Sequence, residues 1–258
     1  RVPNVKIQKR IALILFSIDK LLNHLEVQLD KLIKLKEIVT NKLLHSNLEN
    51  IYFKDNKLDI IPNGWEVKSI KNFFVETKNF TNSINKYPLY SLTIDEGITA
   101  KTDRYERSFL LTDLDKENYK VLEKDVFALN PMNLRFGAIA KNENDFSVCI
   151  SKYYSTFKLK NSEFNSDFFL EYFKSRKMIK LYDMIATGTL DEKRRVHLIQ
   201  FLNLKLPFPQ KKTQDMIAKK LVFFKNKIKL KKLKIKKIKL LREGLIQDLI
   251  TGKFKLNE

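Results

Sequence analysis

The chain has 258 residues, of which 43% are hydrophobic, so it can bury a sizeable core in one or two domains. Its formal net charge of +20 favours a polyanionic partner, because lysine and arginine side chains that neutralise phosphates release counterions. The single cysteine, Cys149, excludes an intrachain disulfide framework, and a reducing cytoplasm is the expected compartment. No apolar run approaches the roughly 18 residues of a membrane span, and no membrane partner is expected. No signal peptide precedes the first predicted helix, although the chain opens on Arg1 rather than Met.

The first predicted element is a long helix over residues 8–46, a range that contains neither Pro nor Gly. Its apolar residues recur in alternating steps of four and three, which is the heptad spacing of a coiled coil, until a polar break at Lys36. A continuous helix of this length would extend about 58 Å, at about 1.5 Å per residue. The residues predicted to face a partner helix are Ile11, Leu15, Ile18, Leu22, Leu25, Leu29 and Leu32.

The middle of the chain, residues 51–209, is predicted to be a separate domain with a small sheet. It opens on a turn at Ile61-Pro-Asn-Gly-Trp65, and residues 168–184 have helical spacing. A polar loop then runs from Ile185 to Leu190 and is followed by a basic run. Short apolar or alternating segments predict strands at residues 65–70, 87–94, 126–129, 148–150 and 154–159, with a turn and a further strand over 130–139.

The middle segment shows no pattern of residues typical of catalysis. The three histidines and Cys149 lie at unrelated spacings, which fit neither a metal cluster nor a nucleophile–base pair. No Gly-rich loop could hold a nucleotide cofactor. Asn130-Pro-Met-Asn133 is similar to the Asn-Pro-Pro-aromatic motif of amino-methyltransferases but lacks the aromatic residue. We therefore expect no catalytic residue, no metal and no cofactor, with an enzyme of unrecognised type as an alternative.

The last segment, residues 210–258, is predicted to be a second long helix that copies the first. A shift of 206 positions (217 − 11) places Gln8 on Gln214, Ile11-Ala12 on Ile217-Ala218 and Leu35 on Leu241. Residues 227–231 alternate with period two, as a strand would, but the heptads on both sides favour a helix. The repetition favours a dedicated coiled-coil pair over two helices that merely bury apolar stripes in one core. The facing residues predicted here are Ile217, Leu221, Phe224, Ile228, Ile235, Ile238, Leu245 and Leu249.

The second helix carries over half of the net charge of the chain. Residues 210–251 contain 13 Lys and one Arg against Asp215, Glu243 and Asp248, a net charge of +11 (14 − 3). Three interpretations stay open: contact with phosphates, a solvated helix face, and a basic surface for an acidic protein.

Several short motifs, taken in order, resemble the specificity subunits of type I restriction–modification systems, and the resemblance covers almost the whole chain. Each motif is weak alone, and the set gains its specificity from the order and from the duplicated helix. Thr213 and Ile7 depart from the family, which often has Glu before the Gln of the helix entry. The motifs are Ile61-Pro-Asn-Gly-Trp65, Asn130-Pro-Met-Asn-Leu-Arg-Phe-Gly-Ala138, Ile150-Ser-Lys-Tyr-Tyr154, Leu206-Pro-Phe-Pro209, Gln214 with Ile217-Ala218, and the tail 244–252.

The resemblance implies an α+β fold, in which a small mixed-sheet target recognition domain is flanked by two long helices in an antiparallel coiled coil. The implied domains are a first conserved helix at 1–50, the recognition domain at 51–209 and a second conserved helix at 210–258. The implied function is non-catalytic: sequence-specific binding of duplex DNA, reading one half of a bipartite site. The implied partners are adenine methyltransferase subunits, a restriction/translocase subunit and a second recognition domain. That second domain would come from self-dimerisation of a half-subunit or from a lost upstream part.

A different class of function stays open, namely a coiled-coil scaffold whose basic helix binds an acidic protein. For DNA recognition we expect the polar and basic segments of the middle domain to line the contact surface. Asn133, Thr187 and Thr189 are the candidate base readers. The full set of predicted DNA-binding residues is Lys101, Arg104, Arg107, Asn133, Arg135, Thr187, Thr189, Lys193, Arg194 and Arg195.

Overall fold

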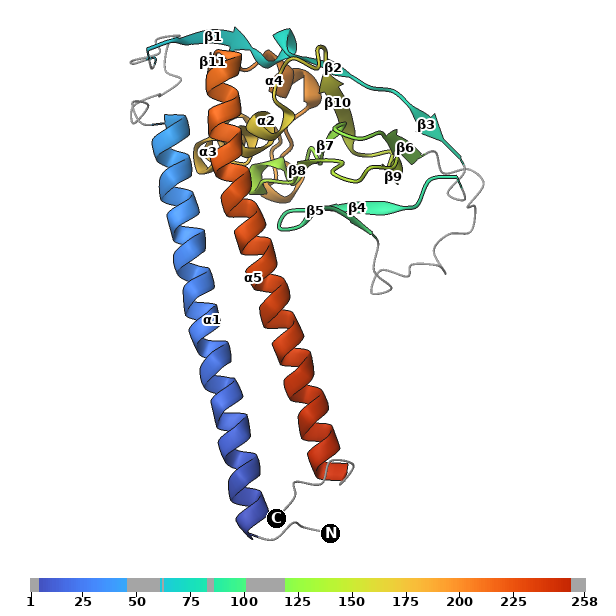
Figure 1. Cartoon of the computed structure of the whole chain (residues 1–258). Helices are drawn as coiled ribbons and strands as arrows, with labels where there is room; N and C mark the ends of the chain where they lie inside the picture. Colours follow the sequence, from blue (N-terminus) through green and yellow to red (C-terminus); the bar gives the residue numbers. More distant parts are fainter. Residues whose placement is uncertain (1–4, 46–60, 62, 83–85, 101–118, 252–258) are drawn as a thin grey trace. The chain divides into compact units, whose positions relative to one another are not determined.

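The computed structural model describes residues 5–45, 61, 63–82, 86–100 and 119–251 (Figure 1). The chain divides into two compact units, one from residues 1–42 with 219–258 and the other from Leu43–Ala218. Both long helices contribute to the two units, since the end of the first helix and the start of the second belong to the central one. Among the described residues, no helix is long and apolar enough to cross a bilayer.

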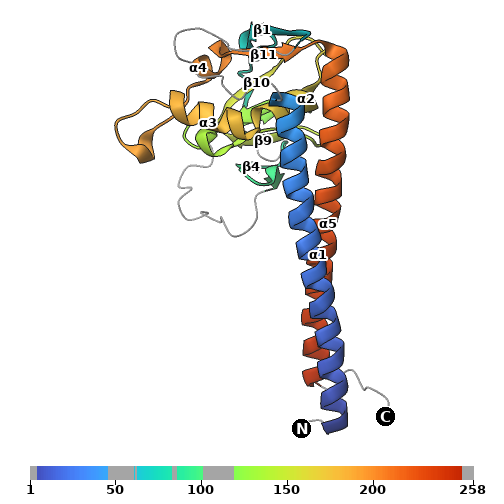
Figure 2. The same cartoon turned by 90° about the vertical axis from the view of Figure 1, so that its left-hand side faces the viewer.

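The first unit is a pair of long helices, α1 (Val5–His45) and α5 (Lys211–Thr251), which run side by side in Figures 1 and 2. Each helix has 41 residues, and α5 begins and ends 206 positions after α1 (211 − 5 and 251 − 45). The sequence repeat is therefore also a structural repeat. The two helices are antiparallel, because contacts move backward along α5 as they move forward along α1: Asp19 meets Arg242, whereas Gln28 meets Lys231.

The interface of the helix pair consists of an apolar seam with polar pairs at its border. Leu22, Leu25 and Ile235 form its buried centre, and they are packed against Ile18, Leu29 and Ile238. The polar residues that interrupt the seam of α5 bind across to α1: the Arg242 guanidinium donates to Asp19 at 2.6 and 3.1 Å, and Lys231 donates to Gln28 at 2.5 Å. All fifteen residues predicted to face the partner helix are buried or half-buried.

In its described residues the second unit contains four small antiparallel sheets, whose strands are labelled in Figure 1. Strand β1 (Trp65–Ser69) pairs with β11 (Lys205–Pro209), and β4 (Tyr90–Thr93) pairs with β5 (Gly97–Ala100). A three-stranded sheet has the order β3 (Phe80–Thr81), β6 (Tyr119–Leu122), β9 (Val148–Ser151). The four-stranded sheet has the order β2 (Phe74–Glu76), β10 (Ser155–Leu159), β7 (Phe127–Leu129), β8 (Ile139–Lys141).

The helices of this unit are α2 (Ser166–Phe173), α3 (Arg176–Ile185) and α4 (Leu198–Asn203). Short 3-10 helices follow β1 (η1, Ile70–Asn72), precede β8 (η5, Leu134–Phe136) and precede α4 (η6, Asp191–Lys193). Asn165 caps the N-terminus of α2, because its side chain accepts a hydrogen bond from the Phe168 N–H at 3.0 Å. Asp167 in the first turn of α2 complements the helix dipole.

The main core is aromatic and lies between the four-stranded sheet and the helices. Phe74 makes edge-on ring contacts with Phe127, Phe157 and Phe169, with ring centroids 4.9–5.3 Å apart. Rings of this size bury much apolar area and prefer such tilted contacts. A second, aliphatic core joins β4, β6 and β9 to β7 and β8 and contains Leu92, Leu122, Val126, Ala128, Ala138, Ala140, Val148 and Ile150.

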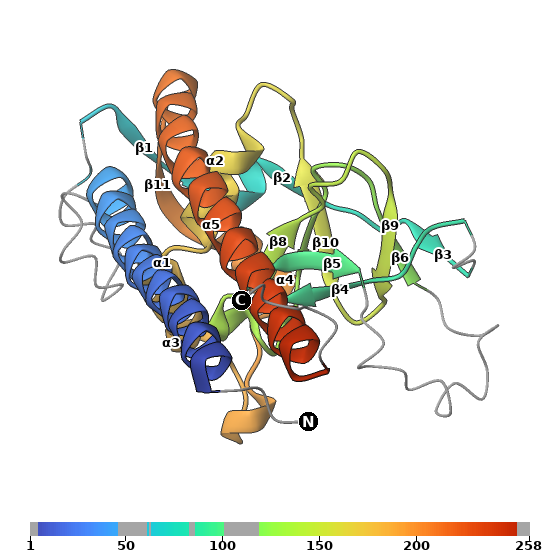
Figure 3. The same cartoon turned by 60° about the horizontal axis from the view of Figure 1, so that its bottom comes forward.

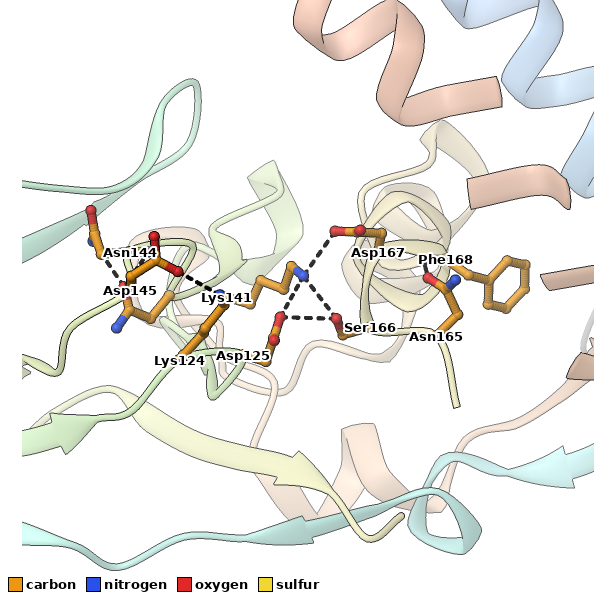
Figure 4. Close-up of polar contacts among 10 residues, drawn as sticks. Lys124, Asp125, Lys141, Asn144, Asp145, Asn165, Ser166, Asp167 and Phe168 are labelled. Atoms are coloured by element: carbon orange, nitrogen blue, oxygen red, sulfur yellow. Dashed lines mark hydrogen bonds and ion pairs between the residues drawn. The ribbon is translucent and has the colours of Figure 1, made fainter. Parts of the chain in front are cut away.

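One buried lysine links the sheet to the start of α2 (Figure 4). The Lys141 ammonium donates to Asp125 at 2.6 Å and to the Ser166 hydroxyl at 2.8 Å, and it lies 2.8 Å from Asp167. Asp125 has φ +61, a conformation that L-residues rarely adopt, and it turns the chain between β6 and β7. The lysine thus satisfies two half-exposed carboxylates and ties a strained turn to the N-terminus of α2.

The predicted α+β class with a long antiparallel helix pair is confirmed, and the sheets are antiparallel throughout the described strands except for one parallel bridge, Leu89 to Cys149. The helical segment predicted at 168–184 is two helices, because the chain breaks at Lys174-Ser175, where the Tyr182 hydroxyl donates to the Phe173 carbonyl. Strands β2, β3, β5, β6 and β11 and helix α4 were not predicted from the sequence. Most of them are only two to five residues long, too short for a clear periodic pattern.

Candidate nucleic-acid interface

The first half of the candidate site is the turn between β7 and β8, which begins at Asn130. The Asn130 side chain accepts a hydrogen bond from the Met132 N–H at 3.1 Å, and the Asn133 carbonyl accepts from Phe136 and Ala138. Gly137 ends η5 at φ +91, and a Cβ there would lie 3.2 Å from Ile179. The Asn133 side chain is exposed beside this turn.

The second half is the loop between α3 and α4, the orange segment that extends away from the sheets in Figures 2 and 3. Thr187 and Arg195 close its base through two backbone hydrogen bonds of 3.0 and 2.9 Å. Gly188 has φ +142, and a Cβ would lie 3.0 Å from the backbone of Lys193 and Arg194, so the tight base requires glycine. The loop exposes Thr187, Thr189, Lys193 and Arg195.

The structure brings these two halves together although they are over 50 residues apart in sequence. The Val196 N–H donates to the Pro131 carbonyl at 2.9 Å, which ties the end of the loop to the turn. The Arg135 guanidinium forms two hydrogen bonds to Asp191, at 2.7 and 3.1 Å. Asn133 and Arg135 therefore lie on the turn that this loop contacts.

Arg135 and Arg194 form a charge-balanced cluster with Asp183 and Asp191. Arg194 Nη1 lies 3.3 Å from Asp183 and 3.5 Å from Asp191, while Arg135 Nη1 lies 3.7 Å from Asp183. The hydrogen bond from Arg135 lowers the pKa of the Asp191 carboxyl, and the same bond raises the pKa of Arg135. Two of the predicted DNA-binding arginines are thus already paired within the protein, and the Arg135 side chain is only 11% exposed.

The sequence analysis singled out the arginines but missed the aspartates that pair with them. Asp191-Glu192 immediately precedes the basic run Lys193-Arg194-Arg195 in the sequence, and this acidic pair was the available signal for such a pairing. Lys101, Arg104 and Arg107 lie outside the described residues. Among the residues that the structure describes, no three His, Cys, Asp or Glu side chains are grouped as a metal site would require.

Gln214, one of the motif residues, connects the first turn of α5 to the rest of the central unit. Its side chain is buried; its amide donates to the Pro209 carbonyl at 3.0 Å, and its carbonyl accepts from the Asn165 N–H at 3.4 Å. The Asn165 side chain donates to Asp215 at 2.6 Å. The Gln in this motif therefore has a structural role: it joins β11, α2 and α5.

Comparisons with known proteins relate the chain to specificity subunits of type I restriction enzymes. It is 26% identical, over 98% of its length, to the type I restriction enzyme MjaVIII specificity subunit of Methanocaldococcus jannaschii. It is 25% identical, again over 98% of its length, to the putative type I restriction enzyme MjaX specificity subunit of the same organism. No protein-family model matches the chain.

Two solved structures share the fold. The type I restriction–modification S subunit from M. genitalium matches 99% of the chain with a TM-score of 0.61 and 17% sequence identity. The HsdS subunit from Thermoanaerobacter tengcongensis matches 98% with a TM-score of 0.53 and 11% identity.

The resemblance predicted from the sequence is confirmed, and the chain is a relative of the type I restriction–modification specificity subunits. It spans about 60% of the length of the relatives that it matches: 61% and 59% of the two M. jannaschii proteins and 62% and 60% of the two solved chains.

Proposed function

We propose that the chain reads one half of a bipartite DNA site and makes no catalytic contribution of its own. The observation that carries this proposal is the joining of the Asn-Pro turn to the Thr187–Arg195 loop, which gathers candidate base readers and cations on one protruding surface. Amide and hydroxyl side chains read base edges, while lysine and arginine side chains bind phosphates. The relationship to specificity subunits supports the same assignment.

Within this surface the residues have different proposed roles. Lys193 and Arg195 are exposed and have no carboxylate partner among the described residues, so they bind phosphates. Asn133, Thr187 and Thr189 read base edges. Arg135 and Arg194 keep their place in the site by holding the loop against the turn. Lys101, Arg104 and Arg107, which lie outside the described residues, stay predicted DNA contacts.

The direct test compares Lys193→Ala and Arg195→Ala with Lys180→Ala, which alters a lysine of α3 for which no partner is seen among the described residues. Each loop variant should weaken binding to random duplex DNA and reduce the slope of affinity against salt by about one. Mobility shift at two salt concentrations measures both quantities. If both loop variants retain the affinity and the salt slope of the wild type, the loop does not contact DNA.

The proposed protein partners are methyltransferase subunits, and the outward faces of the helix pair provide a surface for them. On each helix a second apolar stripe lies about half a turn away from the seam, at about 100° per residue. Leu35 and Leu241 occupy the same position of the repeat (241 − 35 = 206) and are both exposed. The exposed stripes comprise Leu13, Phe16, Val27, Leu35 and Ile38 on α1 and Phe223, Leu230, Leu233, Leu240 and Leu241 on α5.

Exposed apolar side chains that line one face of a helix are a feature of protein interaction sites. Because the stripe occurs once on each repeated helix, it suits two equivalent partner helices. The double substitution Leu35→Lys with Leu241→Lys should abolish copurification with the methyltransferase subunit but leave DNA binding intact. The control, Ile199→Lys, places the same charge at an exposed position of α4 and should leave the complex intact. An unchanged complex in the double variant would contradict this partner surface.

A scaffold for an acidic protein is the second candidate, and the charge of α5 favours it. Residues 219–242 contain eleven lysines and one arginine with no acidic residue. Lys229, Lys232 and Lys236 are exposed and have no acidic partner among the described residues. Under this alternative the wild-type chain would show no salt-dependent shift of random duplex DNA, so the same mobility-shift experiment separates the two functions.

A further inference from the structure

A lysine of the three-stranded sheet occupies a position where the alternation of the strand calls for an apolar residue. In β6, Lys120 lies on the same face as Leu122, which belongs to the aliphatic core. Its directly paired neighbours are Phe80 on β3 and the fully buried Ile150 on β9. A lysine at such a position must pack its aliphatic stem along the core and extend its ammonium toward solvent.

The ammonium of Lys120 is held there without a carboxylate. It donates to the Tyr154 carbonyl at 2.7 Å and lies 5.6 Å from the centroid of the Phe80 ring. An ammonium has three N–H donors, and the described residues supply one acceptor for them. Partial burial lowers the pKa of Lys120, an effect that Glu76 opposes and Lys78 reinforces. The geometry leaves a fixed, half-desolvated cation with spare donors.

The surroundings of this cation are basic and aromatic. Lys152 and Tyr153 lie in the turn from β9 to β10, next to the carbonyl that holds Lys120, and the Lys152 ammonium is 5.7 Å from the Tyr153 ring centroid. Tyr153 is 77% exposed and lies at the apex of this turn, where the Tyr154 N–H donates to the Ser151 carbonyl. Phe80 is also half exposed. The acidic neighbour, Glu76, is 3.9 Å from Lys78.

We propose that the edge formed by Lys120, Lys152 and Tyr153 binds the sugar–phosphate backbone of duplex DNA outside the bases that the Thr187–Arg195 loop reads. This inference rests on the proposed DNA-binding function and adds a second contact to it. One phosphate oxygen accepts the spare N–H donors of Lys120, the Lys152 ammonium binds the next phosphate, and the Tyr153 ring packs on the sugar between them. Such contacts fix the register of the protein on DNA and carry no sequence information.

The polyanion fits this edge better than a protein carboxylate does. Among the described residues named here, Lys78, Lys120 and Lys152 outnumber Glu76, and an extended row of phosphates can occupy two cations at once. The exposed aromatic rings provide flat apolar surface for sugars rather than a pocket for one side chain. A second phosphate contact would also help to fix the orientation of the domain on DNA, because the other proposed contacts come from the Asn-Pro turn and the Thr187–Arg195 loop.

The test uses the full chain and a random-sequence duplex at several salt concentrations. Lys120→Met keeps the length and apolar stem of the side chain but removes the charge. It should weaken binding by about tenfold at about 0.1 M salt and reduce the salt slope by about one. Lys120→Arg should retain most of the affinity. The control Lys205→Met removes an exposed lysine from the separate β1–β11 sheet and should have a smaller effect on both quantities.

A thermal melt of each variant shows whether the fold is intact. If Lys120→Met unfolds, the exposed pair Lys152→Gln with Tyr153→Ala tests the same edge and should weaken binding in the same way. This inference is overturned if folded Lys120→Met binds DNA with the affinity and salt slope of the wild type. If Lys120→Met unfolds, the same result in the Lys152→Gln, Tyr153→Ala pair overturns it. A loss of affinity in Arg195→Ala would still support the proposed function. A wild-type chain that binds no duplex at low salt overturns both.

Discussion

Arg135 and Asp191 are joined by two hydrogen bonds, of 2.7 and 3.1 Å, across 56 positions of sequence. Paired N–H···O bonds between a guanidinium and a carboxylate fix the relative orientation of both groups. This pair therefore sets where the Thr187–Arg195 loop lies relative to the Asn-Pro turn. Arg135, which was predicted as a direct DNA contact, is better placed to position the residues that are proposed to make that contact.

The first prediction follows from that pairing. Asp191→Asn removes a carboxylate from the surface, so the affinity for random duplex DNA should rise. The variant also loosens the loop, so the preference for the specific site over random DNA should fall. The ratio of affinities for specific and random DNA should fall by about tenfold, the scale of one mismatched base pair. Competition binding, with a site obtained by selection, measures the ratio. Asp145→Asn removes a carboxylate from the exposed Lys124–Asp145 pair and is the control; an equal fall in both variants would argue against positioning.

The second prediction concerns the buried centre of the helix pair. Leu25 is 6% exposed and is clustered with Leu22 and Ile235, so Leu25→Ala should cost about 2–5 kcal/mol of unfolding free energy if the cavity cannot collapse. Leu13→Ala, on the exposed side of the same helix, should cost much less. Urea unfolding followed by circular dichroism measures both. A loss below about 0.5 kcal/mol for Leu25→Ala, the usual range of exposed sites, would place that residue outside the interface.

The third prediction is a pH dependence from Lys141. Burial disfavours charge on Lys141, but the bonds to Asp125 and Asp167 outweigh it and raise its pKa; the pKa of Asp125 is lowered in turn, against its own burial. The lowered Asp125 pKa adds stability that is present above about pH 4 and is lost as pH falls through the folded pKa. The raised Lys141 pKa adds stability that is present below about pH 10 and is lost as pH rises through the folded pKa.

Lys141→Met should therefore lower stability at pH 7 by about 1–3 kcal/mol, a range reduced for the exposure of both carboxylates. It should also flatten the stability profile at its acid and alkaline ends. Unfolding midpoints from pH 3 to 11 test this expectation, and Lys158→Met is the control at an exposed lysine of β10. A profile with unchanged curvature in Lys141→Met would show that this cluster contributes nothing to the pH dependence.

The fourth prediction treats the helix pair as a ruler between two recognition domains. One heptad inserted midway into each helix keeps the seam in register and lengthens the pair by about 10 Å, at about 1.5 Å per residue. At about 3.4 Å per base pair, the selected half-sites should move apart by about three base pairs, although the groove also rotates by a quarter turn or more. Site selection with the methyltransferase partner reads the spacing. Full affinity for the original gap would show that the helices do not set it.

The helix pair could be predicted from the sequence, because a heptad repeat is a local pattern that can be recognised without knowledge of the tertiary structure. The apolar spacing predicted a first helix over residues 8–46 and a second from residue 210, and the structure has these helices at Val5–His45 and Lys211–Thr251. The strands at 127–129, 148–151 and 155–159 were also predictable, because they are continuous apolar or alternating runs between turn residues.

Which of the predicted DNA-binding residues are already paired within the protein could be learned only from the tertiary structure. Arg135, Arg194 and Lys193 look equivalent in the sequence, yet two of them are paired with aspartates that come from α3 and η6, and the third is exposed. Lys120 shows the converse, since nothing in Tyr119-Lys-Val-Leu122 indicates that its ammonium is held by a carbonyl 34 positions away. Pairing between distant segments depends on strand order and turn geometry, and these physical constraints are non-local, so a linear pattern does not record them.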